Sequence, residues 1–177
     1  MDYFIMRQDP RTDNTIKLMP DSPKLHKLTR SQIDNISLTK ILYVKERAYN
    51  SEYSDYLETY MLVSEKLKRI MSKYQSNAIF KTVVLIERKI NRQEIYYLIS
   101  APLIQCASDQ TVYNKQGQVK EFVLDEEKVG HARIFKADNY ENHVLVRLDV
   151  AESILRRDSY GVSFDRVTID RMNTTKE

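Results

Sequence analysis

The chain has 177 residues, 42% of them hydrophobic and 30% charged, which is enough for one sizeable core and argues against intrinsic disorder. Its 3 Gly and 4 Pro exclude collagen-like or linker-like character, and its single Cys excludes a disulfide framework and a multi-cysteine metal site. The formal net charge of +3 is small for a dedicated nucleic-acid-binding protein. We therefore expect a single globular domain over residues 1–177.

The termini and the hydropathy predict a cytoplasmic protein. The apolar patch in residues 3–6 is shorter than the core of a signal peptide, and the longest apolar runs, such as Val83–Ile86, have the length of a strand and not of a membrane span. Asp2 stands where a myristoylation signal requires glycine.

In the first half of the chain, alternating and continuous apolar patterns predict several short elements. They are a strand at 2–6, a loop at 8–21, a strand at 37–45, a short helix at 50–57 and a buried strand at 60–63. A clear helix then begins after Ser64, a residue type that accepts backbone N–H bonds as an N-cap. The apolar side chains of this helix recur at helical spacing at Leu67, Ile70, Met71 and Tyr74.

The second half is richer in strand patterns. We expect strands at 78–86, 94–99, 103–105, 132–135, 143–147 and 162–169, and a hairpin over 112–122 that turns at 114–117. A second helix is predicted to begin with Asp149 as its cap, to present Val150, Ala151, Ile154 and Leu155 on its apolar face, and to end at Gly161. This order predicts an α+β fold with mixed, largely antiparallel sheets and a few short helices.

Two segments, 60–88 and 143–170, have a similar order of strand, capped helix and strand. Phe80 and Phe164 each precede a Val by three residues, although the two caps are one residue out of step. Duplication of one module explains the likeness, and so does chance, because such units are common.

A search for catalytic patterns finds little. Cys106 with His131 is the one candidate pair for nucleophilic catalysis, and a lone Cys beside a strand is more often a buried apolar residue. The acidic run at 125–127 lacks the alternating ligands of a calcium loop, and the three Gly residues are isolated, so no phosphate-binding loop occurs. We therefore expect no metal and no cofactor.

Charge and aromatic patterns suggest binding instead. Eight basic and two acidic residues give residues 64–92 a net charge of +6, so Lys66, Arg69 and Lys73 of the helix at 64–75 could lie along phosphates, although a solvated helix face is the preferred interpretation. Tyr49, Tyr53 and Tyr56 recur at helical spacing and are candidate interface anchors, against the alternative that this stripe packs on the domain's own core. The acidic run Asp125, Glu126 and Glu127 is the candidate polar contact.

Several stretches resemble the eleventh immunity-protein family of bacterial polymorphic toxin systems, formerly a domain of unknown function. The likeness covers most of residues 55–170 and rests on these stretches: Asp55-Tyr56-Leu57, Leu62 to Leu67, Phe80 to Val83, Tyr96 to Ile99, Leu103 to Cys106, Phe122 to Lys128, Ile134 to Lys136, Val144 to Val146 and Gly161 to Phe164. The family often has Asp where Gln105 stands, which puts a role for that acid in doubt here.

The resemblance implies an α+β protein that is encoded beside a toxin and binds the toxin's catalytic domain in the producing cell, with no catalytic residues of its own. A non-catalytic binding protein whose partner is a cognate toxin domain is therefore the leading hypothesis. The alternatives are a small enzyme with a site near Cys106 and His131, and a nucleic-acid-binding module that uses the helix at 64–75. No membrane partner is expected, and the oligomeric state is not predicted.

Overall fold

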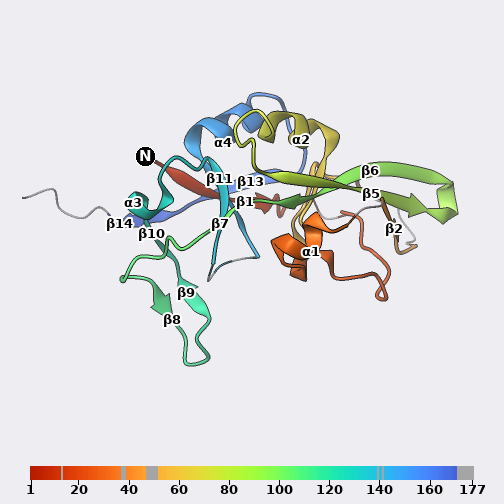
Figure 1. The fold of residues 1–177 in the computed structure, drawn as a ribbon. Coiled ribbons are helices and arrows are strands. Elements are labelled where there is room, and N and C mark those ends of the chain that lie inside the picture. Colours follow the sequence, from red (N-terminus) through yellow and green to blue (C-terminus); the bar gives the residue numbers. More distant parts are fainter. Residues whose placement is uncertain (13, 37–38, 47–51, 139, 141, 171–177) are drawn as a thin grey trace, which may run out of the picture.

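The computed structural model describes residues 1–12, 14–36, 39–46, 52–138, 140 and 142–170 (Figure 1). In this part of the chain, two five-stranded sheets and two two-stranded sheets are combined with four short α-helices. Most strand pairs are antiparallel and a minority are parallel. The predicted α+β class with mixed sheets is therefore confirmed.

The first sheet is buried on both faces. Its strand order is β13 (Val162–Arg166), β1 (Tyr3–Gln8), β12 (Val144–Arg147), β11 (Ile134–Ala137) and β7 (Leu103–Ile104). Alternate residues of these strands enter two different apolar clusters. Met6, Val144 and Val146 belong to one cluster, and Ile5 and Leu145 belong to the other. Burial on both sides explains why these strands are nearly continuous apolar runs in the sequence.

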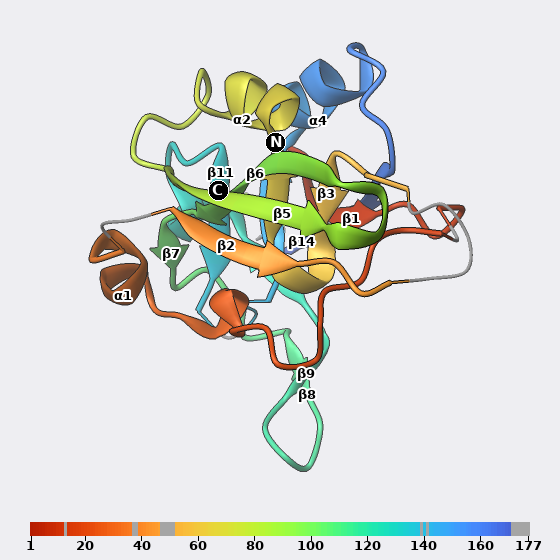
Figure 2. The same ribbon diagram turned by 90° about the vertical axis from the view of Figure 1, so that its right-hand side faces the viewer.

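The second sheet has the order β2 (Lys40–Tyr43), β5 (Ile79–Glu87), β6 (Arg92–Ser100), β4 (Leu62–Ser64) and β3 (Tyr56–Leu57). The segment 16–33, which leads into α1 (Arg30–Asp34), contributes buried side chains to the same cluster as Leu42 and Leu85 and lies beneath the sheet (Figure 2). On the other side lie α2 (Glu65–Met71) and α4 (Leu148–Leu155), which contact each other.

Each five-stranded sheet contains one strand–helix–strand unit, β4–α2–β5 in the second sheet and β12–α4–β13 in the first. In both, the two strands joined by the helix flank an antiparallel middle strand, β6 or β1. In the second sheet, Leu98 of β6 lies opposite Leu62 of β4 on one side and opposite Lys81 of β5 on the other, so Leu62 and Lys81 are aligned across β6. Phe80 therefore precedes the residue aligned with Leu62 by one position.

The first sheet has the same local register. Leu145 aligns with Ile5 and Asp165, and Phe164 again precedes the aligned position by one residue. Phe80 and Phe164 therefore occupy corresponding places, and both pack against the same apolar cluster. The crossover through α4 is one residue longer, the reverse of the offset expected from the sequence, because the cap of α4 is Arg147 and not Asp149. A duplication of residues 60–88 and 143–170, and a single domain over 1–177, stay predictions.

The remaining elements form one end of the molecule (Figure 1). Strand β10 (Val123–Asp125) pairs in parallel with β14 (Thr168–Asp170) and leads into the one-turn helix α3 (Glu126–Val129). The predicted hairpin is present as β8 (Val112–Tyr113) and β9 (Val119–Glu121), and it projects away from the body.

The predicted helix at 50–57 is wrong where the structure describes it. Tyr56–Leu57 form strand β3, which pairs with Leu62–Val63 across the short 3₁₀ helix Glu58–Tyr60. Met61 closes this turn with a left-handed backbone (φ 54°). The tyrosine spacing resembled a helix, but the tight turn allows β3 and β4 to pair as a hairpin.

Further predictions need correction at the C-terminal end. The N-cap of α4 is Arg147 and not Asp149, and Leu155, predicted on the apolar face, is 56% exposed. The predicted strand 162–169 is divided at Val167, where the chain leaves β1 and joins β10 as β14. Helices α1 and α3 were not predicted, because each is only four or five residues long.

Candidate partner-binding surface

The tyrosine stripe is only in part accessible. Tyr49 lies outside the described residues. Tyr53 is half-buried and donates a hydrogen bond to Glu87 Oε2 (2.7 Å), and the Arg92 guanidinium lies 3.9 Å from its ring centroid. Burial and the bond to the Glu87 carboxylate raise the pKa of the Tyr53 phenol, so it remains a neutral donor.

Tyr56 is fully buried in the core, so its side chain cannot serve as a surface anchor. Its hydroxyl has no hydrogen-bond partner among the described residues, and burial raises its pKa. The interpretation that this stripe packs on the domain's own core therefore holds for Tyr56, which belongs to the inner side of β3 and not to an exposed helix.

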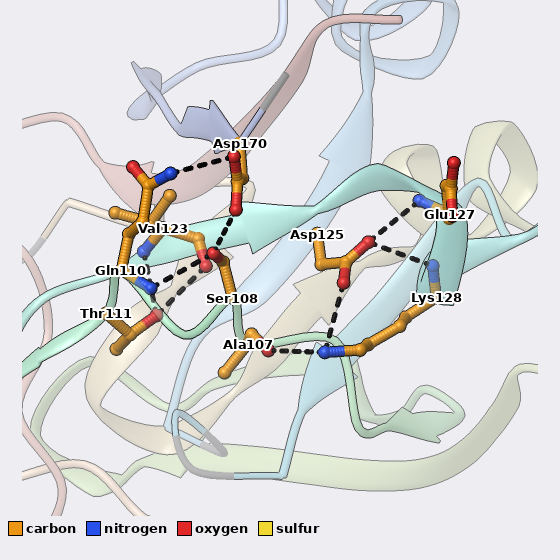
Figure 3. A network of polar contacts seen from close by, with 9 residues as sticks. All are labelled: Ala107, Ser108, Gln110, Thr111, Val123, Asp125, Glu127, Lys128 and Asp170. Carbon is orange, nitrogen blue, oxygen red and sulfur yellow. Dashed lines mark hydrogen bonds and ion pairs between the residues drawn. The ribbon is translucent and has the colours of Figure 1, made fainter. Parts of the chain in front are cut away.

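The predicted acidic contact lies at the junction of β10 and α3 (Figure 3). Asp125 is the N-cap of α3: its Oδ1 accepts from the backbone N–H groups of Glu127 (3.1 Å) and Lys128 (3.4 Å), and its Oδ2 lies 3.0 Å from Lys128 Nζ. The Lys128 ammonium, with these N–H groups, lowers the pKa of the Asp125 carboxyl. Lys128 also donates to the Ala107 carbonyl (3.2 Å). The charge of Asp125 is thus used to hold α3 in place.

Beside this cap, Asp170 on the neighbouring strand accepts hydrogen bonds from Ser108 and from Gln110 Nε2, and Thr111 bonds both backbone groups of Val123 (Figure 3). These contacts tie the loop before β8 to β10 and β14. They fix the position of the neighbouring α3.

The other two acids reach the surface to different extents. Glu126 forms an ion pair with the amino group of Met1, and its side chain is 37% exposed. Glu127 is exposed and contributes its backbone N–H, but not its carboxylate, to the cap. The structure therefore brings Asp125, Glu126 and Glu127 together, but Glu127 alone presents its carboxylate fully to solvent.

The alternative catalytic site is not assembled. Cys106 is fully buried, and burial raises the pKa of its thiol to about 12, so the nucleophilic thiolate is absent at neutral pH. His131 is exposed in the turn after α3. The burial of the Cys106 thiol therefore gives no support to a catalytic site near Cys106 and His131.

The basic face of α2 is largely occupied by intramolecular partners. Lys66 donates to the Asp158 carbonyl (2.7 Å), and Arg69 Nε pairs with Glu65 Oε1 (2.8 Å). Lys68 Nζ lies 3.7 Å from both Glu65 Oε2 and the centroid of the Tyr97 ring. Lys73 is exposed. A helix whose cations are already paired gives little support to the nucleic-acid hypothesis.

Sequence reasoning missed a polar cluster that joins the two large sheets. Arg7 Nη1 donates to Glu58 Oε1 (2.7 Å) and to His143 Nδ1 (2.8 Å), and Arg7 Nε donates to Asp165 Oδ2 (3.1 Å). The backbone N–H of Gln8 donates to Glu58 Oε2 (2.9 Å). No sequence signal links these residues, because more than 130 positions separate Arg7 from its C-terminal partners.

The chemistry of this cluster is structural. Burial would raise the pKa of Glu58, but His143, Arg7 and the Gln8 N–H hold it at about 2. The Nδ1 atom of His143 lies 2.8 Å from Arg7 Nη1 and 3.6 Å from Glu58 Oε1, so both groups hold the imidazole at the edge of a hollow of about 450 Å³.

Sequence reasoning also missed an exposed apolar group on the second sheet. Ile41 is 56% exposed and Ile95 is 54% exposed, although both lie within strands. The signal in the sequence was the run from Ile95 to Ile99, which is apolar or aromatic on both sides of the strand although Ile95 at its start is exposed.

Within the described ranges, no helix is both long and apolar enough to cross a membrane, and no group of three or more His, Cys, Asp or Glu side chains is arranged to hold a metal ion. No curated protein matches the chain. A profile of the Immunity protein family (Imm11) matches residues 5–168, from the first strand of the first sheet to the last strand of the small parallel sheet. The match spans nearly the whole chain and both large sheets, and the chain therefore belongs to the Imm11 immunity protein family.

Proposed function

We propose that this chain is an immunity protein that neutralises a cognate toxin by binding it, without chemistry of its own, in the cytoplasm of the cell that makes the toxin. The family match over residues 5–168 carries this proposal. The buried, protonated state of Cys106 and the hydrogen-bonded state of His143 also support binding over catalysis.

Neutralisation of this kind requires a stable interface that covers or distorts the toxin's site. Such interfaces bury about 1,600 Å² in total and depend on a few anchoring side chains. Among the residues predicted from sequence, Tyr53, Glu126 and Glu127 reach the surface, so we retain them as candidate contacts. Asp125 contributes indirectly, because it caps α3, the helix that carries the two glutamates.

Co-expression provides the test. The full chain is produced with the C-terminal domain of the toxin encoded by the gene immediately upstream, and cell survival and co-purification are measured. We expect the chain to restore growth and to elute with the toxin domain as one complex at micromolar concentration. A toxin domain from an unrelated locus serves as the control and should not be neutralised.

Failure to form a complex at micromolar concentration, with both proteins folded, would contradict the proposal. Glu127→Lys in the same assay tests the contribution of the exposed Glu127 carboxylate to binding. Lys115→Glu in the β8–β9 loop is the matched charge reversal. Weaker binding of the Glu127 variant alone would support a contact at α3.

A further inference from the structure

Among the described residues, the second sheet has one apolar side that helix α2 covers only in part. Strand pairing places Ile41, Val84 and Ile95 in a row across β2, β5 and β6, and Tyr43, Ile86 and Gln93 in the next row. These six residues are called the outer face below. Their neighbours along each strand, such as Leu42, Leu85 and Tyr96, point to the opposite side and are buried.

The exposure of the outer face follows from the lengths of the elements. Helix α2 covers this side of the sheet only as far as Tyr97, against whose ring Lys68 is placed. Strands β5 and β6 continue beyond the helix as a long hairpin (Figures 1 and 2). Ile41, Ile95 and Tyr43 are 56%, 54% and 38% exposed, and none of the six outer-face residues is charged.

Such a surface is unusual for a sheet that faces water. Antiparallel strands with one solvated face normally alternate apolar and polar residues, and exposed edge strands are normally protected by charged side chains. A contiguous apolar patch of this kind marks an interaction site. The two sides of the first sheet offer the contrast, since both are covered by packed side chains.

The border of the outer face is basic. The Arg88 guanidinium lies 4.1 Å from the centroid of the Tyr43 ring, and Lys68, which is also paired with Glu65, lies over Tyr97 at the opposite end. The turn that joins β5 to β6 adds the exposed Lys89 and the exposed apolar Ile90. A cation held over an aromatic ring is fixed in place and still presents its charge to a partner.

An apolar centre with a basic border favours some binding partners of the outer face over others. In a two-fold dimer the face would meet itself, and the basic borders of both copies would be brought together, which is unfavourable. A nucleic acid would gain little from the apolar centre, which offers no hydrogen-bond donors. A protein surface with apolar side chains surrounded by carboxylates satisfies both the centre and the border.

We infer that the outer face of β2, β5 and β6 is the principal docking surface for the toxin domain, and that the toxin presents there an apolar patch bordered by acidic residues. The inference rests on the proposed function and adds to it the position and chemistry of the contact. The isoleucines form the buried centre of the interface, and Arg88 pairs with the acidic border.

The main experiment introduces Ile41→Lys and Ile95→Lys, singly and together, into the full chain. Leu155→Lys on α4 is the matched control, because Leu155 is as exposed as Ile41 but lies outside the outer face. Binding to the upstream-encoded toxin domain is measured by calorimetry, after circular dichroism has shown that each variant is folded. We expect each outer-face variant to raise the Kd at least about 30-fold, the size of a typical hot spot, and the control to leave it within about threefold.

A second set of variants tests the charge of the border. Arg88→Glu is compared with Lys115→Glu, a reversal in the projecting β8–β9 loop. We expect Arg88→Glu to lower the association rate about tenfold at low salt, with the difference shrinking as salt is added, because steering is screened. Lys115→Glu should leave the rate unchanged.

The outcomes separate the two proposals. If the unaltered chain binds the toxin domain and the isoleucine variants bind equally well, the docking assignment is overturned and the proposed function stands. If the unaltered chain does not bind, both are overturned. Sedimentation showing a dimer that Ile95→Lys dissociates, or binding of a DNA duplex that Arg88→Glu abolishes, would assign the face to another occupant and overturn the inference.

Discussion

The two strand–helix–strand units share their arrangement and differ in what covers them. In β12–α4–β13 the middle strand β1 has both sides buried, because one apolar cluster lies on each side of the first sheet. In β4–α2–β5 the partner strands β5 and β6 extend past the helix, and one side of the extension faces solvent. The same local topology therefore serves as a packed core in one sheet and as an open surface in the other.

The units also differ in how their helices begin. Ser64 caps α2 by accepting the Leu67 N–H (3.3 Å) and donating to Asp55 Oδ1 (2.5 Å). Arg147, the N-cap of α4, makes no such bond, and its guanidinium pairs instead with Asp149 (2.7 Å). The α4 unit is thus stabilised mainly by burial and the α2 unit partly by local hydrogen bonds.

The largest effect is expected at the turn that leads from each helix into the next strand. Gly161, before β13, has φ +69°, and an added Cβ would lie 2.5 Å from Ser54 Oγ; the residue directly before β5 is Ala78. We expect Gly161→Ala to cost about 3 kcal/mol of unfolding free energy, from the left-handed backbone and the overlap together. Urea denaturation measures it.

Gly117 provides the control for this prediction. It also has a positive φ (+75°), but an added Cβ would meet nothing within 4 Å. Gly117→Ala should therefore cost about 1 kcal/mol, the backbone contribution alone. Equal costs at both glycines would mean that the contact with Ser54 relaxes freely.

The next effect concerns the contact between the units. Glu58, in the turn before β4, binds Arg7 and Gln8 of β1, and its pKa is lowered from 4.5 to about 2. A lowered carboxyl pKa stabilises the fold above the unfolded value, and this contribution is lost as the pH falls from about 4.5 toward about 2. We expect Glu58→Gln to lower the stability at pH 7 by on the order of 2 to 3 kcal/mol and to remove this acid dependence.

Thermal unfolding between pH 2 and 7 checks the prediction for Glu58. Asp165→Asn is the matched control, because the Asp165 side chain is 64% exposed and its pairing with Arg7 should contribute little. An unchanged acid transition in the Glu58 variant would show that other carboxylates govern it.

A smaller effect is expected at the helix caps. Ser64→Ala removes the bond to the Leu67 N–H and should cost about 1 kcal/mol, whereas Ser72→Ala at the exposed C-terminal end of α2 should cost less than about 0.5 kcal/mol. Arg147→Ala removes a part-buried ion pair with Asp149 but no cap, and we expect it to cost less than Ser64→Ala. The reverse order, measured by chemical denaturation, would contradict the contrast between the units.

The smallest effect has the opposite sign. The Tyr56 hydroxyl is buried without a described partner, so Tyr56→Phe removes an unsatisfied group and should stabilise the protein by up to about 1 kcal/mol. Tyr96→Phe is the counterpart, since the Tyr96 hydroxyl donates to the Ser54 carbonyl (2.7 Å), and this variant should be destabilised. A loss of stability in both variants would indicate that Tyr56 has a partner after all.

Local features of this fold were predictable from the sequence. Helix α2 begins after Ser64 as expected, because the cap and the apolar spacing lie within a few residues of each other. The hairpin at 112–122 was also predicted, since its turn residues are contiguous. The break at Val167 was not, because β14 forms only where Val123–Asp125 is available to pair.

The candidate surface was harder to predict. Ile95 and Ile99 both lie on the same side of the strand predicted at 94–99, yet Ile99 is fully buried and Ile95 is 54% exposed. The difference depends on where α2 ends over the sheet, which no local pattern encodes. Likewise Asp125 and Glu127 are both acidic members of one short run in the sequence. It is the backbone geometry of α3 that makes Asp125 the cap and leaves Glu127 exposed.

The central place of β1 in the first sheet has a consequence for synthesis. Within this chain Tyr3–Gln8 is made well before both of its neighbours in the sheet, Val144–Arg147 and Val162–Arg166. The first sheet therefore cannot close around β1 until Val162–Arg166 has been synthesised, and a product that ends before Val144 would leave β1 without either neighbouring strand.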